Sequence, residues 1–554
     1  MKKLNLGCGQ DYKIGWVNVD ADHNVKADLY FDVAKKFPLK DESFDYILAQ
    51  DVLEHLTFQQ AKIFLSECKR VLRVNGVLEI RVPNLFDIFK RFKSDPEVLF
   101  KFIYGNTESH SIYGLHKYGY TLNTLKKHLA LAGFKVIESK YKTTNLIVKS
   151  KKIKFPKLKF RLVISLLDSG GYGGSEMFLL SLAKEINQSY KVQFLTLNNH
   201  LINSKLKSNK IKFTSIGFRN DLIGGFKGLI KFFLLLPYSI FSYLNILKEL
   251  KNNGYQSILL PGFTDKILIT PLAKLLGFDV IWLQYAPLGD LLKKFFYLPK
   301  VLYRISVRFV DLLVCPTNYA KTKIIPELRL SESKIRQIPC GTVLLSRVQK
   351  KSYLSKRETL RKKLNLKGFV AGCVSRLDKD KGQDVLIKSA VYLKRKLPEF
   401  TIVIVGQGGQ EVYLKSLVNK LGLQQYVRFT EFYEDVYEIL SCFDLFVFPT
   451  RWGLEGFGLA PFEAVAVGIP VILADHPVLR EIWKNQDWFF KPTPKILAKK
   501  IYQIYNLDKQ EIIVQQKQLL RQYDIKKISK LYLEELLNLA KIRSILIKAY
   551  KVKL

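Results

Sequence analysis

The stretch EGFGLAPFEAVAVGIPVILAD, residues 455–475, decides the fold. It follows the apolar run LFVFPT (445–450), places a glycine-rich turn before a helical pattern, and ends in a second apolar run, IPVILAD (469–475). A strand, a glycine turn, a helix and another strand in this order are typical of a parallel sheet covered by helices. The stretch therefore predicts an α/β fold.

The same stretch carries polar chemistry at its glycine turn. The backbone N–H groups of Gly456, Phe457 and Gly458 stand at the start of the predicted helix, where they are placed to bind phosphate or sugar oxygens. Glu455 lies before the helix and Glu463 within it, and each carboxylate can accept two hydrogen bonds from hydroxyl groups. This pattern indicates a site for a phosphorylated sugar.

Working outward, the strand and helix alternation begins three times along the 554 residues, which are too many for one hydrophobic core. We expect three Rossmann-like units in series. The predicted divisions are a first domain (1–150), a basic linker (151–159), an N-terminal acceptor-side domain (160–345), a C-terminal donor domain (346–520) and a basic helical tail (521–554).

A second polar motif follows the apolar run FVAGCV (369–374). In SRLDKDKG (375–382), Arg376 and Lys381 come after a strand, at the edge of an open α/β sheet where ligands bind. Their positive charges suit a diphosphate leaving group.

These motifs together resemble the retaining glycosyltransferases of family 4, which have the GT-B fold. The resemblance covers about residues 160–530 and rests on the motifs above and on further elements in the family's order: GGYGGSE (170–176), QIPCG (337–341) and VGQG (405–408). It implies a nucleotide-sugar donor, transfer with retention of configuration, and no bound metal.

The resemblance also implies roles for single residues. Arg376 and Lys381 neutralise the donor diphosphate, Glu463 binds the donor ribose, and Glu455 binds the transferred sugar. Gly173 and Gly174 belong to the loop over the diphosphate, and Gly406 leaves room near the nucleoside; Gly456, Phe457 and Gly458 complete the donor-binding set. Gln284 and Tyr285 stand where the family often has a histidine, so no general base is assigned there.

The first 150 residues carry a different glycine turn. In LNLGCG (4–9) a predicted strand leads into Gly7 and Gly9, and the next strand, VNVD, ends at Asp20, placed to accept hydrogen bonds from a ribose. With FPLKDESFDYILAQDVLEHL (37–56), this region resembles class I S-adenosylmethionine-dependent methyltransferases. The resemblance implies that Gly7, Gly9, Asp20, Asp32 and Asp51 bind S-adenosylmethionine and that Glu54 and His55 form the family's E-H signature.

Departures from the methyltransferase pattern leave two alternatives open. Gln10 and Asp11 replace the usual third glycine, and the helices that normally precede the first strand are missing. The unit is therefore either an active methyltransferase or a methyltransferase-like fold without activity. His116 is either a general base or a structural histidine.

The net charge of +40 lies mostly after residue 150 and favours an anionic partner. Nucleic acid is not expected, because no nucleic-acid reading motif is present. Two segments are candidates for contact with an anionic membrane, 224–248 and 291–313, each read either as an interfacial helix or as a core helix with a basic outer face. The first is not expected to cross a bilayer, because Lys231 and Pro237 interrupt its apolar run.

The six cysteines have no metal-ligand or disulfide spacing, and the N-terminus does not read as a signal peptide. We therefore expect a cytoplasmic protein, at the inner face of the cell membrane if it binds lipid.

The leading interpretation is a glycosyltransferase that acts on a lipid-linked or polysaccharide acceptor in cell-surface glycan synthesis, fused to a methyltransferase. The alternative is a membrane-docked scaffold with an inactive methyltransferase-like domain. The donor sugar, acceptor and linkage stay open.

Overall fold

The structure is a computed structural model that describes residues 1–105, 115–142, 144–152, 160–167, 173–198, 200–220, 222, 225–286, 297–431, 433, 435–451 and 455–550. The chain divides into two compact units, one of residues 1–158 with 541–554 and one of residues 159–540. Much of the predicted linker, from residue 153 to 159, lies outside the described residues.

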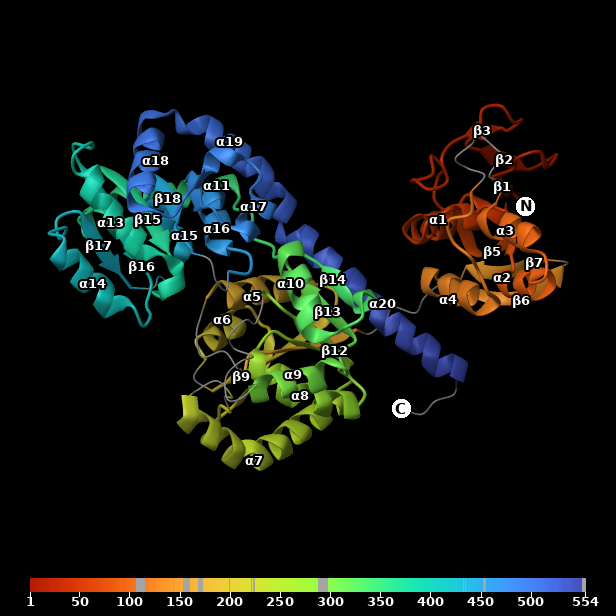
Figure 1. The fold of residues 1–554 in the computed structure, drawn as a ribbon, viewed down its shortest axis with the longest axis horizontal. Helices are drawn as coiled ribbons and strands as arrows, with labels where there is room; N and C mark the ends of the chain where they lie inside the picture. The colour runs from red at the N-terminus through yellow and green to blue at the C-terminus, as the bar shows by residue number, and fades with distance from the viewer. Residues whose placement is uncertain are drawn as a thin grey trace. The chain divides into compact units, whose positions relative to one another are not determined.

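The first unit is a single sheet with helices against it (Figure 1, red to orange). Among its described residues the sheet has seven strands in the order β3-β2-β1-β4-β5-β7-β6. The strands are β1 (Lys3–Leu6), β2 (Val17–Asp20), β3 (Leu29–Tyr30), β4 (Phe44–Gln50), β5 (Leu72–Pro83), β6 (Phe134–Lys142) and β7 (Asn145–Lys152). The helices are α1 (Phe58–Val71), α2 (Leu85–Phe92), α3 (Pro96–Tyr104) and α4 (Leu122–Ala132), with a 3-10 turn η1 (Leu53–His55) after β4.

One strand of this sheet runs against the others. β7 pairs antiparallel with both β5 and β6, whereas the other neighbours are parallel. The strand and helix alternation predicts a parallel sheet, and the sheet is mostly parallel. β7 is the exception, because β6 and β7 form a hairpin with no helix between them.

The second unit contains two parallel sheets. In the first, the described strands have the order β10-β9-β8-β11-β12-β13-β14. They are β8 (Arg161–Ser165), β9 (Lys191–Leu197), β10 (Lys212–Ile216), β11 (Ser257–Leu260), β12 (Asp279–Leu283), β13 (Leu312–Cys315) and β14 (Ile335–Gln337). The helices are α5 (Gly174–Asn187), α6 (Ile202–Ser208), α7 (Gly225–Asn252), α8 (Phe263–Leu275), α9 (Leu298–Val307) and α10 (Asn318–Leu328).

The second parallel sheet has the strand order β17-β16-β15-β18-β19-β20. Its strands are β15 (Phe369–Val374), β16 (Phe400–Val405), β17 (Val427–Thr430), β18 (Leu445–Phe448), β19 (Val471–Ala474) and β20 (Phe489–Phe490). The helices are α11 (Arg347–Ser355), α12 (Arg357–Lys363), α13 (Gln383–Leu393), α14 (Glu411–Lys420), α15 (Val436–Ser441), α16 (Leu459–Val467), α17 (Pro477–Ile482), α18 (Pro494–Asn506), α19 (Lys509–Leu520) and α20 (Ile525–Tyr550). Both sheets reverse strand order beside their first strand, which is the arrangement of a Rossmann-like unit.

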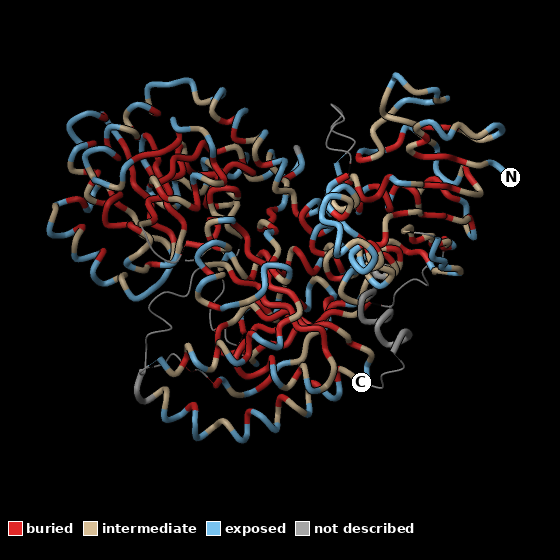
Figure 2. The backbone as a smooth tube through the Cα atoms, turned by 45° about the vertical axis from the view of Figure 1, so that its right-hand side comes forward, coloured by how far each residue is buried: buried red, intermediate tan, exposed pale blue. Residues whose placement is uncertain are grey.

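The central strands of the two parallel sheets, such as β12 and β18, are buried along their whole length and form the cores together with the inner faces of the helices (Figure 2, red). β15 and β16 bury every residue, because helices cover both faces of a parallel sheet. The six cysteines are free and buried.

The predicted C-terminal tail begins as part of the second unit. The Thr342 N–H donates to Tyr523 O at 2.8 Å, and the Ile525 N–H donates to Thr342 O at 2.9 Å. Farther along α20, the ring of Tyr532 lies 5.9 Å from that of Phe178 on α5. The chain therefore returns from the second sheet to the helices of the first.

Helix α7 is unusual among the described helices of this unit for its length and its exposed apolar side chains. It continues through Pro237, and Gly228–Asn252 is long and apolar enough, by length and composition alone, to cross a membrane. Only 17% of its apolar window is buried. One face, which includes Phe232, Tyr243 and Leu247, packs into the core. Both interpretations of 224–248, an interfacial helix and a core-facing helix with a solvated basic face, therefore stay predictions.

Candidate functional site

A cavity of about 1110 Å³ lies within the second unit, where the carboxyl ends of β15, β16 and β18 face the start of α5. All ten residues that the sequence predicted for the glycosyltransferase site line this cavity: Arg376, Lys381, Glu455, Glu463, Gly173, Gly174, Gly406, Gly456, Phe457 and Gly458. They come from four segments, 173–174, 376–381, 406 and 455–463, and the last three meet because the ends of parallel strands share one edge of a sheet.

Two helices begin at this cavity. Gly458, with a φ of 80°, precedes α16, and Gly174 opens α5. A Cβ added to Gly174 would lie 3.5 Å from the Leu459 side chain, so the two helix starts are neighbours. The first N–H groups of a helix lack partners within it and carry partial positive charge. The paired helix starts therefore favour an anionic group such as a diphosphate.

Lys381 and Glu455 form a buried ion pair in the cavity wall. Lys381 Nζ lies 2.9 Å from Glu455 Oε2, and both side chains are largely buried. Burial acts to lower the pKa of Lys381, but the charge and hydrogen bond of Glu455 outweigh it, so the pKa is raised. Lys381 therefore stays positive at neutral pH, and Glu455 is oriented by it.

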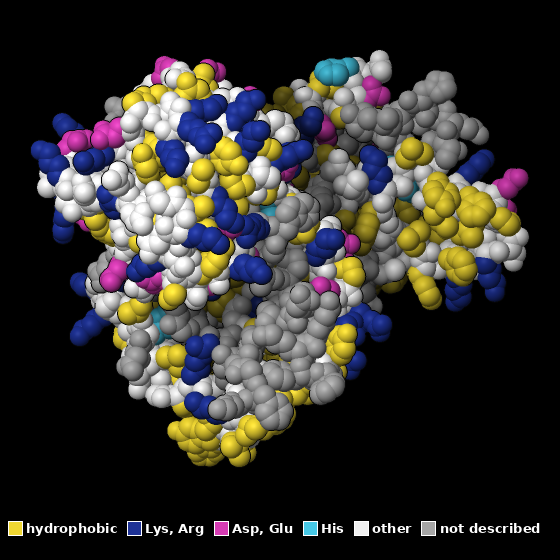
Figure 3. All heavy atoms as spheres, turned by 60° about the vertical axis from the view of Figure 1, so that its left-hand side comes forward, with side chains coloured by type: hydrophobic (Ala, Val, Ile, Leu, Met, Phe, Trp, Pro, Cys, Tyr) yellow, Lys and Arg dark blue, Asp and Glu magenta, His cyan; other side chains and the backbone are white. Residues whose placement is uncertain are grey.

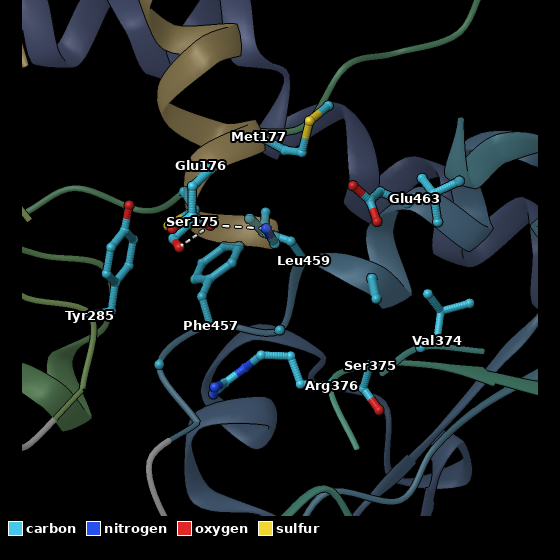
Figure 4. A pocket seen from close by; sticks show the side chains of 18 of the residues that line it. Ser175, Glu176, Met177, Tyr285, Val374, Ser375, Arg376, Phe457, Leu459 and Glu463 are labelled. Carbon is cyan, nitrogen blue, oxygen red and sulfur yellow. Dashed lines mark hydrogen bonds between the residues drawn. The ribbon is translucent and has the colours of Figure 1, made fainter. Parts of the chain in front are cut away.

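Arg376 is the more exposed of the two cations predicted for the site, with a side chain that is 73% exposed. Figure 4 shows Arg376 and Glu463 approaching the cavity from different elements, the segment after β15 and helix α16. Asp378 Oδ2 lies 3.1 Å from Arg376 Nη1, and Asp380 Oδ2 lies 3.7 Å from Lys381 Nζ. Asp378 and Asp380 have the spacing of a metal-binding D-x-D motif, but here each accompanies a cation of the site.

Glu463 has an environment that favours its protonated form. Burial raises its pKa to about 7, and the charge of Asp435 acts in the same direction. A carboxylate with this pKa gains from hydroxyl donors, because they stabilise its charged form. Glu463 is therefore suited to bind two hydroxyl groups of a ligand.

Two predicted glycines are required by backbone packing. A Cβ on Gly406, which has a φ of 137°, would lie 2.0 Å from Ser375 O. A Cβ on Gly456 would lie 2.6 Å from Tyr285 O, which belongs to the segment after β12. Both glycines line the cavity, but the space left by their missing side chains is filled by these carbonyl groups.

Sequence reasoning missed several polar residues that line the cavity: Ser375, Gln407, Tyr353, Asp435 and Tyr437. Tyr353 donates a hydrogen bond to Asp435 Oδ2 at 2.8 Å. Gln383 Nε2 donates to Ser375 Oγ at 2.8 Å and to Arg376 O at 2.7 Å, and so supports the turn that carries Arg376. The glutamine directly after Gly382 could have signalled that turn.

The two residues at the expected histidine position have different environments. Gln284 is buried, and its Oε1 accepts hydrogen bonds from Lys266 Nζ at 2.5 Å and from the Tyr303 hydroxyl at 2.7 Å. Its amide donates to Ala286 O at 2.6 Å. Tyr285 lines the cavity, and burial raises the pKa of its hydroxyl well above the ordinary value. Neither residue is therefore placed to accept a proton at neutral pH.

The glycine turn of the first unit brings three predicted residues together. Gly7 and Gly9 both have positive φ, 65° and 50°. The Gly9 N–H donates to Asp20 Oδ2 at 2.8 Å, and the Asp22 N–H donates to Asp20 Oδ1 at 3.0 Å. Asp20 thus fixes the turn and keeps further acceptor capacity on each oxygen.

The other two predicted cofactor residues lie in separate turns. Asp32 Oδ1 accepts a hydrogen bond from the Ala34 N–H at 2.8 Å. Asp51 follows β4 with a φ of 52°, a conformation that non-glycine residues rarely adopt. A Cβ on Gly7 would lie 2.5 Å from the Val52 side chain, so the turn after β4 lies against the glycine turn.

Comparison with known proteins agrees with this division. Residues 356–519 match the family model of glycosyl transferases group 1, and residues 4–80 match that of a methyltransferase domain. The lipopolysaccharide core biosynthesis mannosyltransferase LpsB of Rhizobium meliloti is 35% identical over 121 residues, which are 21% of this chain and 34% of that protein. The O-antigen biosynthesis glycosyltransferase WclY of Escherichia coli is 31% identical over 131 residues, 23% of this chain and 35% of that protein.

The chain thus spans about a third of the length of these curated relatives. Among solved structures, Anabaena HepE in complex with UDP and glucose aligns with 68% of this chain and 99% of its own, with a TM-score of 0.54 and 20% identity. That likeness shows the fold. The chain therefore contains a group 1 glycosyltransferase domain within a GT-B fold and an N-terminal methyltransferase domain, and this confirms the prediction of these two kinds of unit.

Proposed function

We propose that the second unit transfers a sugar from a nucleotide-sugar donor to a glycan or lipid-linked acceptor in cell-surface glycan synthesis, as a retaining enzyme of family 4. The observation that carries the proposal is the cavity that gathers Arg376, Lys381, Glu455 and Glu463 beside two helix starts. The relatives LpsB and WclY, named for lipopolysaccharide core and O-antigen biosynthesis, support the choice of pathway class.

In this proposal the cavity acts mainly by electrostatics. The helix starts of α5 and α16 and the side chains of Lys381 and Arg376 stabilise the charge that develops on the leaving diphosphate. Glu455, held by Lys381, binds a hydroxyl of the transferred sugar, and Glu463 binds the ribose hydroxyls. Because Gln284 is an amide whose Oε1 already accepts from Lys266 and Tyr303, it is not a base, and the acceptor proton passes to the departing phosphate or to a group on the acceptor side.

The test is nucleotide release and product formation with UDP-, GDP- and other nucleotide sugars. Wild type is compared with Glu463→Ala and with Glu511→Ala, which removes an exposed carboxylate on α19. Turnover that is lost only in Glu463→Ala identifies the donor and supports the site. The anomeric proton coupling of the product, measured by NMR, tests retention. Absence of turnover with every donor, lipid acceptors included, would favour the scaffold alternative.

For the first unit we propose S-adenosylmethionine-dependent methyl transfer, with Gly7, Gly9 and Asp20 at the cofactor. The domain match and the Gly9–Asp20 contact support this proposal. Binding of S-adenosylmethionine by calorimetry distinguishes a cofactor-binding unit from an inactive fold. The acceptor is proposed to be the transferred sugar or one related to it, because two linked active units raise the local concentration of each product.

We also propose that the protein works in the cytoplasm at the inner face of the membrane, through α7. Its exposed apolar side chains include Phe233, Leu234, Tyr238 and Phe241, between 49% and 76% exposed. Lys231 and Lys248 are exposed on the same helix. Hydrophobic side chains gather at the lower edge of Figure 3, where Figure 1 places α7. Exposed apolar and basic groups together suit an anionic lipid surface.

Helix α9 adds a smaller surface of the same kind. Val301 and Ile305 on α9 and Phe309 just after it are 42–52% exposed, whereas Tyr303 and Val307 are buried. Residues 291–296 of the predicted interfacial segment lie outside the described residues. Cosedimentation with anionic and with zwitterionic vesicles tests the proposal. Leu234→Ser with Phe241→Ser should weaken binding to anionic vesicles, whereas Val412→Ser, which changes an exposed apolar residue on α14, should not.

A further inference from the structure

Two distant segments of the first unit meet beside the turn after β4. The 3-10 turn η1 carries Glu54 and His55. The backbone N–H groups of Lys117 and Tyr118 both donate to Glu54 O, at 2.7 and 3.1 Å, and this places His116 next to η1. The rings of His55 and His116 lie with their centroids 4.9 Å apart.

The three side chains have the chemistry and spacing of a metal site. One ligand atom from each of Glu54, His55 and His116 lies within 4.8 Å of the other two. Two imidazoles and a carboxylate are the ligand set of catalytic zinc and of non-haem iron sites that keep open positions. Both histidines are only partly buried, so the cluster is reachable from solvent.

Backbone carbonyls hold both imidazole rings in one tautomer. His55 Nδ1 lies 3.1 Å from Leu115 O, and His116 Nδ1 lies 3.0 Å from Phe102 O. A carbonyl oxygen can only accept, so each Nδ1 carries the hydrogen, and in the neutral ring Nε2 keeps its lone pair. This is the outer-shell arrangement that orients histidine ligands in metal sites.

Glu54 supplies an independent sign that a cation belongs here. Its side chain is 2% exposed, and both carboxylate oxygens are buried without a hydrogen-bond partner among the described residues. A buried carboxylate with no partner is costly, and a bound cation removes that cost. The strained φ of Asp51, 52°, lies at the entrance to the same turn.

We propose that Glu54, His55 and His116 bind one divalent transition-metal ion, of the zinc or manganese type, at the carboxyl end of β4 in the methyltransferase domain. The site is independent of the sugar-transfer proposal. It also departs from the sequence-based expectation of no metal, which rested on the spacing of cysteines and on the glycosyltransferase resemblance. The sequence alone does not show that His116 lies beside Glu54 and His55 on η1, because about 60 residues separate them along the chain.

The experiment measures metal binding by the full chain without cofactor or substrate. Chelator-treated protein is titrated with MnCl₂ and with ZnCl₂ by calorimetry, and bound metal is counted by elemental analysis after gel filtration. We expect one ion per chain for wild type. Glu54→Gln and His116→Ala should each bind at least about tenfold more weakly. His23→Ala is the matched control, because His23 stacks on Tyr30 away from the cluster, and it should bind as wild type does.

Cobalt substitution gives a readout of the ligands themselves. Visible absorption bands of Co²⁺ should appear with wild type and shift or vanish with His116→Ala, whose side chain is only partly buried and whose loss spares the core. Thermal melts without metal identify any variant that has simply unfolded. No bound ion in wild type, or unchanged stoichiometry and affinity in both folded variants, would overturn the proposal.

Discussion

Lys381 Nζ and Glu455 Oε2 lie 2.9 Å apart, although the residues are carried by different turns, one after β15 and one after β18. The pair joins two neighbouring strand ends of the second sheet and places a positive and a negative charge side by side in the cavity wall. Removing either partner would leave the other charge buried without its ion pair, which is costly.

The first prediction concerns this pair. Lys381→Met should lower kcat for nucleotide release by about 10²–10³-fold, because it removes a cation from the leaving group and leaves Glu455 buried without its partner. Lys379→Met removes an exposed lysine from the same turn and should have little effect. Steady-state kinetics with the identified donor measure both. Equal losses in the two variants would mean that the turn, and not the buried charge, matters.

The second prediction concerns the pH dependence of donor binding. The pKa of Glu463 is raised to about 7, so its carboxylate form, which accepts two hydroxyl hydrogen bonds, becomes populated as the pH rises. The KM for the donor should fall between about pH 6 and pH 8, and Glu463→Gln should remove this dependence. A KM that varies with pH in the same way in the variant would exclude Glu463 as the titrating group.

The same shift has a consequence for stability. The folded protein holds the Glu463 proton more tightly than the unfolded chain, so folding loses stability as the pH rises from the ordinary pKa of a glutamate, 4.5, to about 7. Glu463→Gln should therefore raise the Tm relative to wild type more at about pH 8 than at about pH 5. Thermal melts at the two values check the sign.

A further prediction concerns glycine packing beside the cavity. Gly456→Ala would place a Cβ 2.6 Å from Tyr285 O, and it should destabilise the fold by about 1–3 kcal/mol and lower donor turnover. Gly409→Ala adds the same methyl group where no heavy atom lies within 4 Å, so it is the matched control. Denaturant unfolding and donor kinetics compare the two. A neutral Gly456→Ala would show that the segment after β12 moves freely.

The last prediction concerns the first unit. Asp20→Ala should weaken binding of S-adenosylmethionine at least about tenfold, because it removes a ribose acceptor and releases the Gly9 N–H that Asp20 holds. Asp22→Ala, whose carboxylate binds Asn24, should bind the cofactor as wild type does. Calorimetry measures both affinities. If wild type binds no S-adenosylmethionine, the interpretation as a fold without methyltransferase activity is supported.

Much of the cavity was predictable because it lies at strand ends. The apolar runs before Arg376 and Glu455 identified β15 and β18, and parallel strands bring their carboxyl ends to one edge. Tyr353 and Asp435 were not predicted, because their meeting at 2.8 Å depends on how α11 packs beside α15. The exposed face of α7 and the cluster of Glu54 with His116 were also not predicted. Sequence spacing shows which residues share one face of a helix, but it does not show which other elements pack against that face.

The return of α20 to the first parallel sheet makes that half of the GT-B fold a discontinuous domain. Phe178 and Arg336 belong to its early part, and they contact Tyr532 and Glu535 near the end of the chain. During synthesis this half cannot complete its packing until α20, which follows the second sheet in the chain, has been made. An expressed fragment that stops at residue 520 would leave the partners of Tyr532 uncovered and prone to aggregate.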